Sequence, residues 1–159
     1  MTSSGGADPD DRFWLEQALD LSRRCPPSVS AFSVGALVVG DGRLLAAGFS
    51  REDRPHDHAE EVAIRRALEA GVSLDGAVLY SSLEPCASRA SGRRACCDRI
   101  AEAGLRRVVF ACEEPPIFVP GHGAARLRAL GVEVVQLADL APVVREINAH
   151  LAWQRSPGR

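Results

Sequence analysis

The chain has 159 residues, of which 46% are hydrophobic and 25% charged, and its formal net charge is −2. This length suits one domain of about 150 residues, and the composition excludes a disordered chain, a collagen-like repeat and a coiled coil. All 19 basic residues are arginine. Without lysine, the chain cannot form a Schiff base with pyridoxal phosphate or complete the phosphate site of a P-loop protein or a kinase.

The N-terminal half predicts a helix, a hairpin and a second helix. Residues 1–9 are expected to be a flexible lead-in, and a helical period then runs from Asp10 to Arg24, ending before Pro26-Pro27. Two apolar runs, 34–39 and 44–49, flank the turn signal Asp41-Gly42 and predict an antiparallel hairpin. The second helix is predicted over 58–70, because Gly71 is a C-terminal signal.

The C-terminal half alternates predicted strands and helices. The strands are expected at 77–82, 107–111 and 132–136, and the helices at 96–103, 123–130 and 140–153. This alternation indicates parallel strands joined by crossover helices. The two halves together predict an α/β fold with a mixed sheet of about five strands, in a single domain of residues 10–155.

The apolar runs and the cysteines indicate the compartment. No apolar run reaches the roughly 18 to 20 residues of a membrane-spanning helix, and the N-terminus is small, polar and acidic, so we expect a cytoplasmic protein without a membrane partner. The five cysteines are Cys25, Cys86, Cys96, Cys97 and Cys112. This odd set, with three thiols crowded together, favours a metal or catalytic site over disulfides in a reducing compartment.

Four residues form a pattern typical of a catalytic zinc site. His58 and Glu60 open the second predicted helix, Cys86 follows the third predicted strand, and Cys96 opens the next helix. One imidazole and two thiolates fill three of the four tetrahedral positions of Zn²⁺ and leave the fourth for water. Zinc lowers the pKa of that water toward neutrality, and Glu60 is then placed to shuttle protons.

The wider motifs resemble the deaminase half of the bifunctional riboflavin-biosynthesis deaminase/reductase. The residues that carry the resemblance are SLEPC, an arginine-containing insertion, CCDRI, AEAGLRRVV and VPGHG, within about residues 10–136. The resemblance implies a three-layer α/β/α, cytidine-deaminase-like fold and a homo-oligomer, either dimer or tetramer. It also implies that His58, Cys86 and Cys96 hold Zn²⁺, that Glu60 is the acid and base, and that Cys97 is a neighbour of the site.

Two stretches leave the substrate open between two named candidates, and a modified pyrimidine or a purine-like ring of a specialised pathway is a third option. The chain has Ala31-Phe32-Ser33 where the riboflavin deaminases have NPN, and Glu114-Pro115-Pro116 where they have DPN. The AFSVGA stretch is instead similar to cytidine and deoxycytidylate deaminases. The expected function is therefore hydrolytic deamination of a free aminopyrimidine, with the diaminopyrimidine ribotide of riboflavin synthesis as first candidate and a cytosine nucleoside or nucleotide as second.

Candidate substrate contacts surround the predicted metal ligands. Phe32 and Phe118 could stack on a flat ring, and Ser33 and Ala59 lie next to the motifs. Arg89 and Arg93 lie in the insertion, where their guanidinium groups either bind a substrate phosphate or line a solvated loop. His56 and His122 are on loops expected near the pocket, and both also have a purely structural interpretation.

Two further alternatives remain at this point. A nucleic-acid deaminase of the tRNA type needs a broad basic surface and stacking aromatic residues, whereas this chain has 5% aromatic residues and a net charge of −2. We therefore expect a small-molecule substrate and no nucleic acid. The other alternative is a zinc-binding protein that has lost its catalytic activity.

Overall fold

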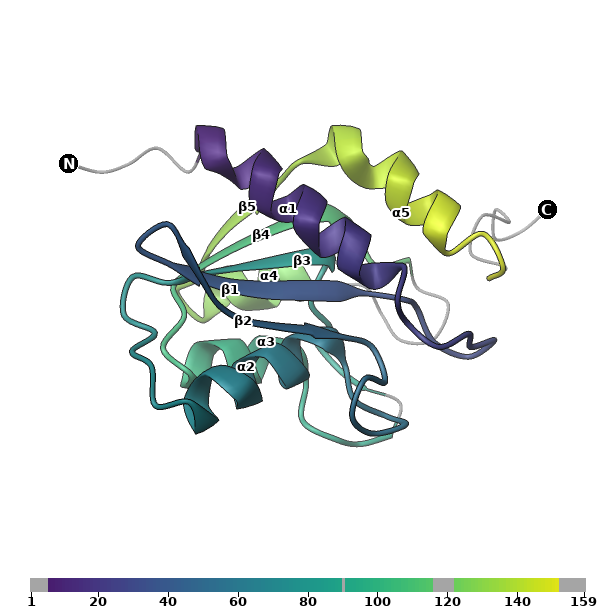
Figure 1. Cartoon of the computed structure of the whole chain (residues 1–159), viewed down its shortest axis with the longest axis horizontal. Coiled ribbons are helices and arrows are strands. Elements are labelled where there is room, and N and C mark those ends of the chain that lie inside the picture. The colour runs from purple at the N-terminus through teal and green to yellow at the C-terminus, as the bar shows by residue number, and fades with distance from the viewer. Residues whose placement is uncertain (1–5, 90, 116–121, 152–159) are drawn as a thin grey trace.

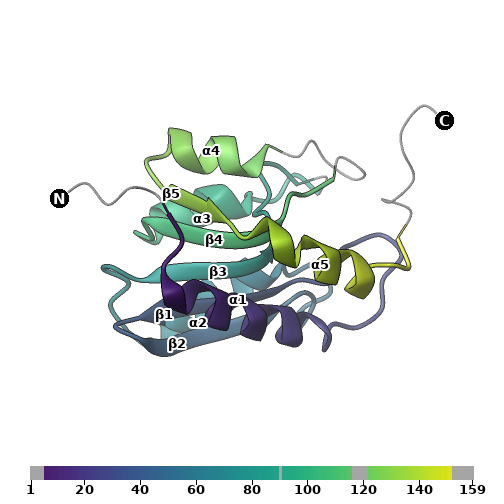
Figure 2. The same ribbon diagram turned by 90° about the horizontal axis from the view of Figure 1, so that it is seen from above.

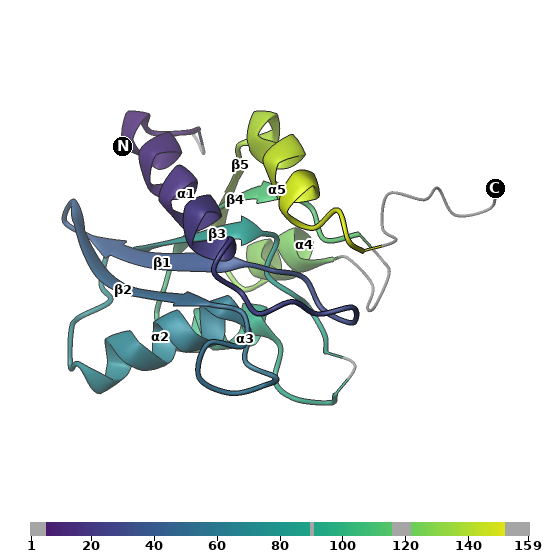
Figure 3. The same cartoon turned by 45° about the vertical axis from the view of Figure 1, so that its right-hand side comes forward.

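The computed structural model describes residues 6–89, 91–115 and 122–151. A five-stranded sheet forms the middle layer, and helices cover both of its faces (Figure 1). Helices α1 (Pro9–Ser22) and α5 (Ala141–Ile147) lie on one face, and α2 (Ala59–Glu69), α3 (Cys96–Glu102) and α4 (Gly123–Ala129) lie on the other (Figure 3). The predicted three-layer α/β/α architecture is confirmed.

The sheet is mixed, as the sequence predicts. Its strands, in the spatial order β2-β1-β3-β4-β5, are β2 (Arg43–Phe49), β1 (Gly35–Gly40), β3 (Val78–Leu83), β4 (Arg107–Cys112) and β5 (Glu133–Gln136). Strand β1 pairs antiparallel with both β2 and β3, whereas β3, β4 and β5 run parallel. The hairpin turns at Asp41 and Gly42, which have φ angles of 50° and 72°.

Close packing of α2 on the hairpin positions one side of the site. Gly48 in β2 makes this contact possible, because a Cβ atom there would lie 2.8 Å from the carbonyl oxygen of Ala59 and 2.7 Å from Cβ of Val62. The first turn of α2 is therefore held directly against the sheet. The residues at the start of α2, His58 and Glu60, take their place from this contact.

The site lies where the parallel strands end. Chain segments leaving the carboxyl ends of β3 and β4 reach the same edge of the sheet (Figure 2). Open α/β sheets usually bind their ligands at this edge. Cys86 follows β3 and Glu114 follows β4, so both residues lie at this edge.

The last helix differs from its predicted extent. A short 3₁₀ turn, Ala138–Leu140, precedes α5, and α5 ends at Ile147 rather than continuing to Trp153. The buried side chain of Asn148 ends the helix, because its amide donates to the carbonyl oxygen of Val144 at 3.0 Å and also binds the backbone of Ser33. Trp153 lies outside the described residues.

The first helix begins slightly earlier than predicted. Pro9 is its first residue, and the Asp8 N–H donates to Oδ2 of Asp11 at 2.7 Å. Of the expected lead-in, Pro9 is thus part of α1 and Asp8 is its N-cap. Residues 1–5 lie outside the described part of the chain.

Two sequence expectations concern membranes and disulfides. Within residues 6–89, 91–115 and 122–151, no helix is long and apolar enough to cross a membrane. All five cysteines are free thiols. The interpretation of the cysteines as something other than a disulfide framework therefore agrees with the structure.

Candidate active site

The fold brings His58, Cys86 and Cys96 together. Their potential ligand atoms all lie within 4.8 Å of one another. Nδ1 of His58 is 3.6 Å from Sγ of Cys86 and 3.4 Å from Sγ of Cys96. Both cysteines are buried, with exposed fractions of 5% for Cys86 and 0% for Cys96.

Each of the three residues stands at a boundary of a secondary-structure element. His58 is the N-cap of α2, Cys86 follows β3 by three residues, and Cys96 is the first residue of α3. The Cys96 N–H donates to Sγ of Cys86 at 3.3 Å, and the Cys97 N–H donates to the Cys86 carbonyl oxygen at 3.1 Å. The start of α3 is thereby held against Cys86 although ten residues separate the two thiols.

The donor atoms have the type and spacing that a tetrahedral zinc ion needs. Zinc–sulfur bonds of about 2.3 Å and zinc–nitrogen bonds of about 2.0 Å place neighbouring ligands of a tetrahedral site about 3.5 Å apart. The distances from Nδ1 of His58 to the two sulfur atoms, 3.6 and 3.4 Å, agree with this spacing. Three protein donors also leave one position open, as in catalytic rather than structural zinc sites.

The two thiols influence each other's ionisation. A hydrogen bond between their side chains, together with His58, lowers the pKa of Cys86 well below its usual range. The same hydrogen bond, together with burial, raises the pKa of Cys96. Of the two thiols, Cys86 is therefore the one that carries the negative charge, and Cys96 stays protonated.

Glu60 lies beside the three donors and faces the same cavity. Its side chain is buried, with Oε1 at 2.8 Å from the hydroxyl of Ser81 and Oε2 at 3.6 Å from Sγ of Cys96. Burial raises the pKa of Glu60. A carboxyl group with a raised pKa can both accept and return a proton near neutral pH.

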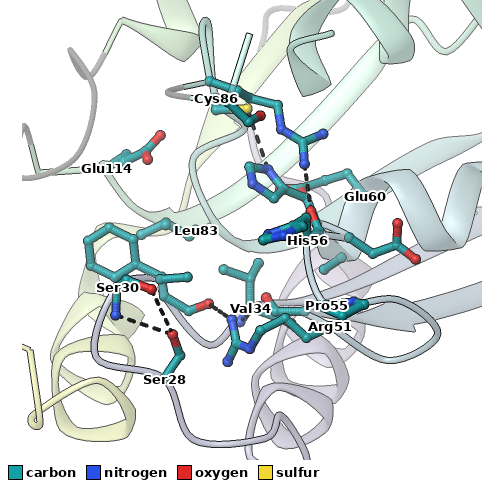
Figure 4. Close-up of a pocket in the computed structure, with 18 of the residues that line it drawn as sticks. Ser28, Ser30, Val34, Arg51, Pro55, His56, Glu60, Leu83, Cys86 and Glu114 are labelled. Atoms are coloured by element: carbon teal, nitrogen blue, oxygen red, sulfur yellow. Dashed lines mark hydrogen bonds between the residues drawn. The ribbon is translucent and has the colours of Figure 1, made fainter. Parts of the chain in front are cut away.

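A cavity of about 270 Å³ opens next to these residues. Three segments line it, namely parts of 28–34, parts of 50–60 and parts of 83–91, and Glu114 completes the wall. In Figure 4, Cys86 and Glu60 lie on one side of the cavity, and Ser28, Ser30 and Arg51 lie on the other. The cavity is thus bounded on one side by potential metal ligands and on the other by polar groups.

The candidate substrate contacts fall into different places. Phe32, Ala59 and Arg89 line the cavity. Ser33 is buried behind the wall, where its N–H donates to Oδ1 of Asn148 at 2.7 Å. Arg93 is not among the described residues that line the cavity, and its Nη2 instead donates to Oε2 of Glu61 at 3.0 Å. Phe118 lies outside the described residues.

His56, His122 and Cys97 also differ in their position relative to the cavity. His56 lines the cavity, whereas His122 is exposed at the N-cap of α4 and is absent from the described lining. Sγ of Cys97 points to the carbonyl oxygens of Pro85 and Gly123, at 3.5 and 3.4 Å. Cys97 therefore faces away from the group formed by His58, Cys86 and Cys96, as its interpretation as a neighbour predicts.

Two residues have roles in the site that the sequence does not indicate. Arg51 donates from Nη1 to the carbonyl oxygen of Phe32 at 3.2 Å and so supports one wall of the cavity. Glu84 accepts the N–H groups of Glu114 and Ala124, at 3.0 and 2.8 Å, and thereby joins the segment after β4 to the start of α4. Glu84 belongs to the SLEPC motif, but only the tertiary contacts reveal this role.

The chain is similar in sequence to known deaminases. Residues 8–112 match the family model described as the cytidine and deoxycytidylate deaminase zinc-binding region. A diaminohydroxyphosphoribosylamino-pyrimidine deaminase of Schizosaccharomyces pombe is 38% identical over 125 residues, which are 77% of this chain and 31% of that protein. A protein of the same name from Buchnera aphidicola is 30% identical over 125 residues, 78% of this chain and 82% of that protein.

The fold has a solved counterpart. The crystal structure of a diaminohydroxyphosphoribosylaminopyrimidine deaminase/5-amino-6-(5-phosphoribosylamino)uracil reductase from Thermotoga maritima superposes with a TM-score of 0.76 at 33% identity. The match covers 86% of this chain and 38% of that one. The chain therefore spans about a third of the length of the S. pombe and T. maritima proteins.

Proposed function

Because the chain belongs to the cytidine and deoxycytidylate deaminase family, whose zinc-binding region residues 8–112 match, we propose that it is a zinc-dependent hydrolytic deaminase of a free aminopyrimidine. The observation that carries the proposal is the grouping of His58, Cys86 and Cys96 within 4.8 Å, beside the carboxyl group of Glu60 at a cavity. The domain proposed to carry this activity is residues 10–155.

In this proposal, His58, Cys86 and Cys96 hold Zn²⁺. The ion, when bound there, supplies Lewis-acid activation of a water molecule near neutral pH. The remaining work belongs to the protein. The cavity walls hold the flat ring, and burial of the two cysteines keeps bulk water away from the donors.

Glu60 is the proposed proton shuttle. Its carboxylate accepts a proton from the attacking water and returns protons to the ring nitrogen and to the leaving ammonia. The hydroxyl of Ser81, at 2.8 Å from Oε1, fixes the orientation of the carboxyl group. The raised pKa of Glu60 suits a group that must be protonated and deprotonated in each cycle.

The first proposed substrate is the diaminopyrimidine ribotide of riboflavin synthesis. The S. pombe, Buchnera and T. maritima proteins carry names that describe this deamination. Arg51 lines the cavity, and an arginine at this place favours a substrate that carries a phosphate. The second candidate is cytidine or deoxycytidylate, which the description of the matching family model favours. A homo-oligomeric assembly is part of the proposal and can be checked by light scattering.

The experiment is ammonia release by the zinc-loaded protein from the ribotide, cytidine, deoxycytidylate, cytosine, guanine and adenosine, and from a tRNA. We expect the highest kcat/KM for the ribotide. Glu69→Ala serves as a control that should release ammonia like the wild type, because Glu69 is exposed at the end of α2. A preference for deoxycytidylate would select the second candidate. Release from a tRNA alone, or no release from any compound despite bound zinc, would contradict the proposal.

A further inference from the structure

Glu61, the residue after the proposed proton shuttle, is a buried carboxylate that contacts both its own helix and the insertion. Its side chain is 3% exposed. Oε1 accepts the backbone N–H of His58 at 3.2 Å and Nη1 of Arg89 at 3.1 Å. Through one oxygen atom, Glu61 thus joins the segment that begins α2 to the segment that follows Cys86.

The second oxygen atom extends the cluster to α3. Oε2 accepts Nη2 of Arg93 at 3.0 Å and lies 3.0 Å from Nη2 of Arg99. Arg93 belongs to the insertion before Cys96, and Arg99 follows Cys96 by three residues on α3. A single carboxylate therefore contacts all three segments that carry the proposed metal ligands.

The side-chain contacts in this cluster are hydrogen bonds and ion pairs between groups of opposite charge. The carboxylate of Glu61 is negative, and the side chains of Arg89, Arg93 and Arg99 that contact it are positive. Three guanidinium groups then surround one carboxylate, and Arg89 is itself only 3% exposed. Charge-assisted hydrogen bonds of this kind are shorter and stronger than neutral ones.

The long insertion explains why such a cluster is needed. Deaminases with a PCxxC motif place two thiols on one tight turn, whereas here Cys96 follows Cys86 by ten residues. The described part of this loop contains no helix or strand. A loop of this length must lose conformational entropy to bring its ends together. The contacts with Glu61 restrain the loop through two of its three arginines, Arg89 and Arg93, and through Arg99 of α3.

We propose that Glu61 is a positioning residue of the metal centre, which joins the segments of His58, Cys86 and Cys96 and thereby sets the spacing of the three donors. This inference rests on the proposed zinc site but not on the identity of the substrate. Arg89 and Arg93 act in this cluster as the partners of Glu61. It follows that the insertion contributes to metal affinity through its side chains.

The test measures metal binding rather than turnover. The zinc dissociation constant is determined by competition with a chromophoric chelator for Glu61→Gln, Arg93→Gln and Arg99→Gln, with Glu69→Gln as the matched control on the exposed end of α2. Residues that orient metal ligands typically contribute about 10–100-fold to affinity. We expect a loss in that range for Glu61→Gln, a smaller loss for each arginine variant, and none for the control.

A second measurement separates positioning from a general loss of stability. The visible absorption spectrum of the Co²⁺ form reports the ligand geometry, and circular dichroism shows whether each metal-free variant is folded. Folded variants with a shifted Co²⁺ spectrum would support the inference. Unchanged zinc affinity and an unchanged spectrum in Arg93→Gln and Arg99→Gln, or in folded Glu61→Gln, would overturn it. A wild-type chain that binds no zinc would overturn the metal centre as well.

Discussion

Glu114 brings another carboxyl group to the cavity that Glu60 faces. Its backbone N–H donates to Oε1 of Glu84 at 3.0 Å, which fixes the residue just after β4. Burial, and then the negative charges of Cys86, Glu60 and Glu84, raise the pKa of Glu114 to about 8. Without a metal, this side chain is therefore mostly protonated at neutral pH.

The raised pKa predicts how Glu114→Gln changes stability with pH. In the unfolded chain the carboxyl group ionises near its ordinary pKa of 4.5, whereas in the folded chain it ionises near 8. The folded state therefore loses stability from this group as pH rises from about 4.5 to 8. We expect metal-free Glu114→Gln and wild type to have similar Tm values at pH 4, and the variant to be more stable at pH 8. A constant difference across this range would contradict the assignment.

At the scale of elements, one buried ion pair joins α1 to the sheet. Arg107, the first residue of β4, donates from Nη1 and Nη2 to the two carboxylate oxygens of Asp11, at 2.8 and 2.7 Å. Tyr80 of β3 donates to the same carboxylate at 2.8 Å. Asp11 is 1% exposed, so these contacts lie between α1 and the strands rather than in solvent.

The contribution of this cluster to the free energy of unfolding should disappear at acid pH. Burial would raise the pKa of Asp11, but the hydrogen bonds from Arg107, the Asp8 N–H and Tyr80 lower it below 3.8. Its contribution is therefore present above about pH 4 and is lost as pH falls below that value. Asp11→Asn should lower the free energy of unfolding at pH 7 by about 3 kcal/mol, measured by urea unfolding. The exposed Asp10→Asn is the control, and an equal effect of both would contradict the account.

The end of α5 forms a second connection between elements, and it supports the cavity wall. Asn148 is fully buried, accepts the Ser33 N–H at 2.7 Å and donates to the Ser33 carbonyl oxygen at 3.3 Å. Ser33 follows Phe32, which lines the cavity. The C-terminal helix therefore holds the backbone of a proposed substrate-binding segment.

Asn148→Ala tests this connection. The substitution removes the amide partner of a buried backbone N–H, which costs about 1–3 kcal/mol, and it releases the wall at Phe32. We expect a lower Tm and a KM that rises more than kcat falls, in steady-state assays with the substrate that the ammonia-release experiment selects. Glu146→Ala, on the exposed side of the same helix, should change neither value. A fall in kcat with an unchanged KM would argue against a role in the wall.

Across the whole molecule, short sequence patterns predicted the features that neighbouring residues determine, namely the strands, the helices and the motif at the start of α2. The strands and helices follow from apolar runs and from turn signals such as Asp41-Gly42, and His58 and Glu60 stand close enough in sequence to form a motif. The mixed sheet was predicted because an antiparallel hairpin in the N-terminal half is followed by alternating strands and helices in the C-terminal half. Each of these signals lies within a short stretch of chain.

Contacts between distant segments could not be predicted in this way. The guanidinium groups of Arg89 and Arg93 can pair with either a phosphate or a carboxylate, and only the fold places Glu61 beside them. The end of α5 depends on Asn148 reaching Ser33, 115 residues away in sequence. The same limit applies to Glu84, whose contacts lie 30 and 40 residues further along the chain.

We propose that this chain deaminates a small aminopyrimidine with Glu60 as its proton shuttle. The most direct test is ammonia release from the diaminopyrimidine ribotide by zinc-loaded wild type and Glu60→Gln, with the zinc content of both measured. We predict turnover by the wild type, a decrease of about 10²–10⁴-fold in the variant, and one zinc ion per chain in each. Undiminished turnover by Glu60→Gln, or no turnover of the ribotide, cytidine or deoxycytidylate by the zinc-loaded wild type, would contradict this assignment.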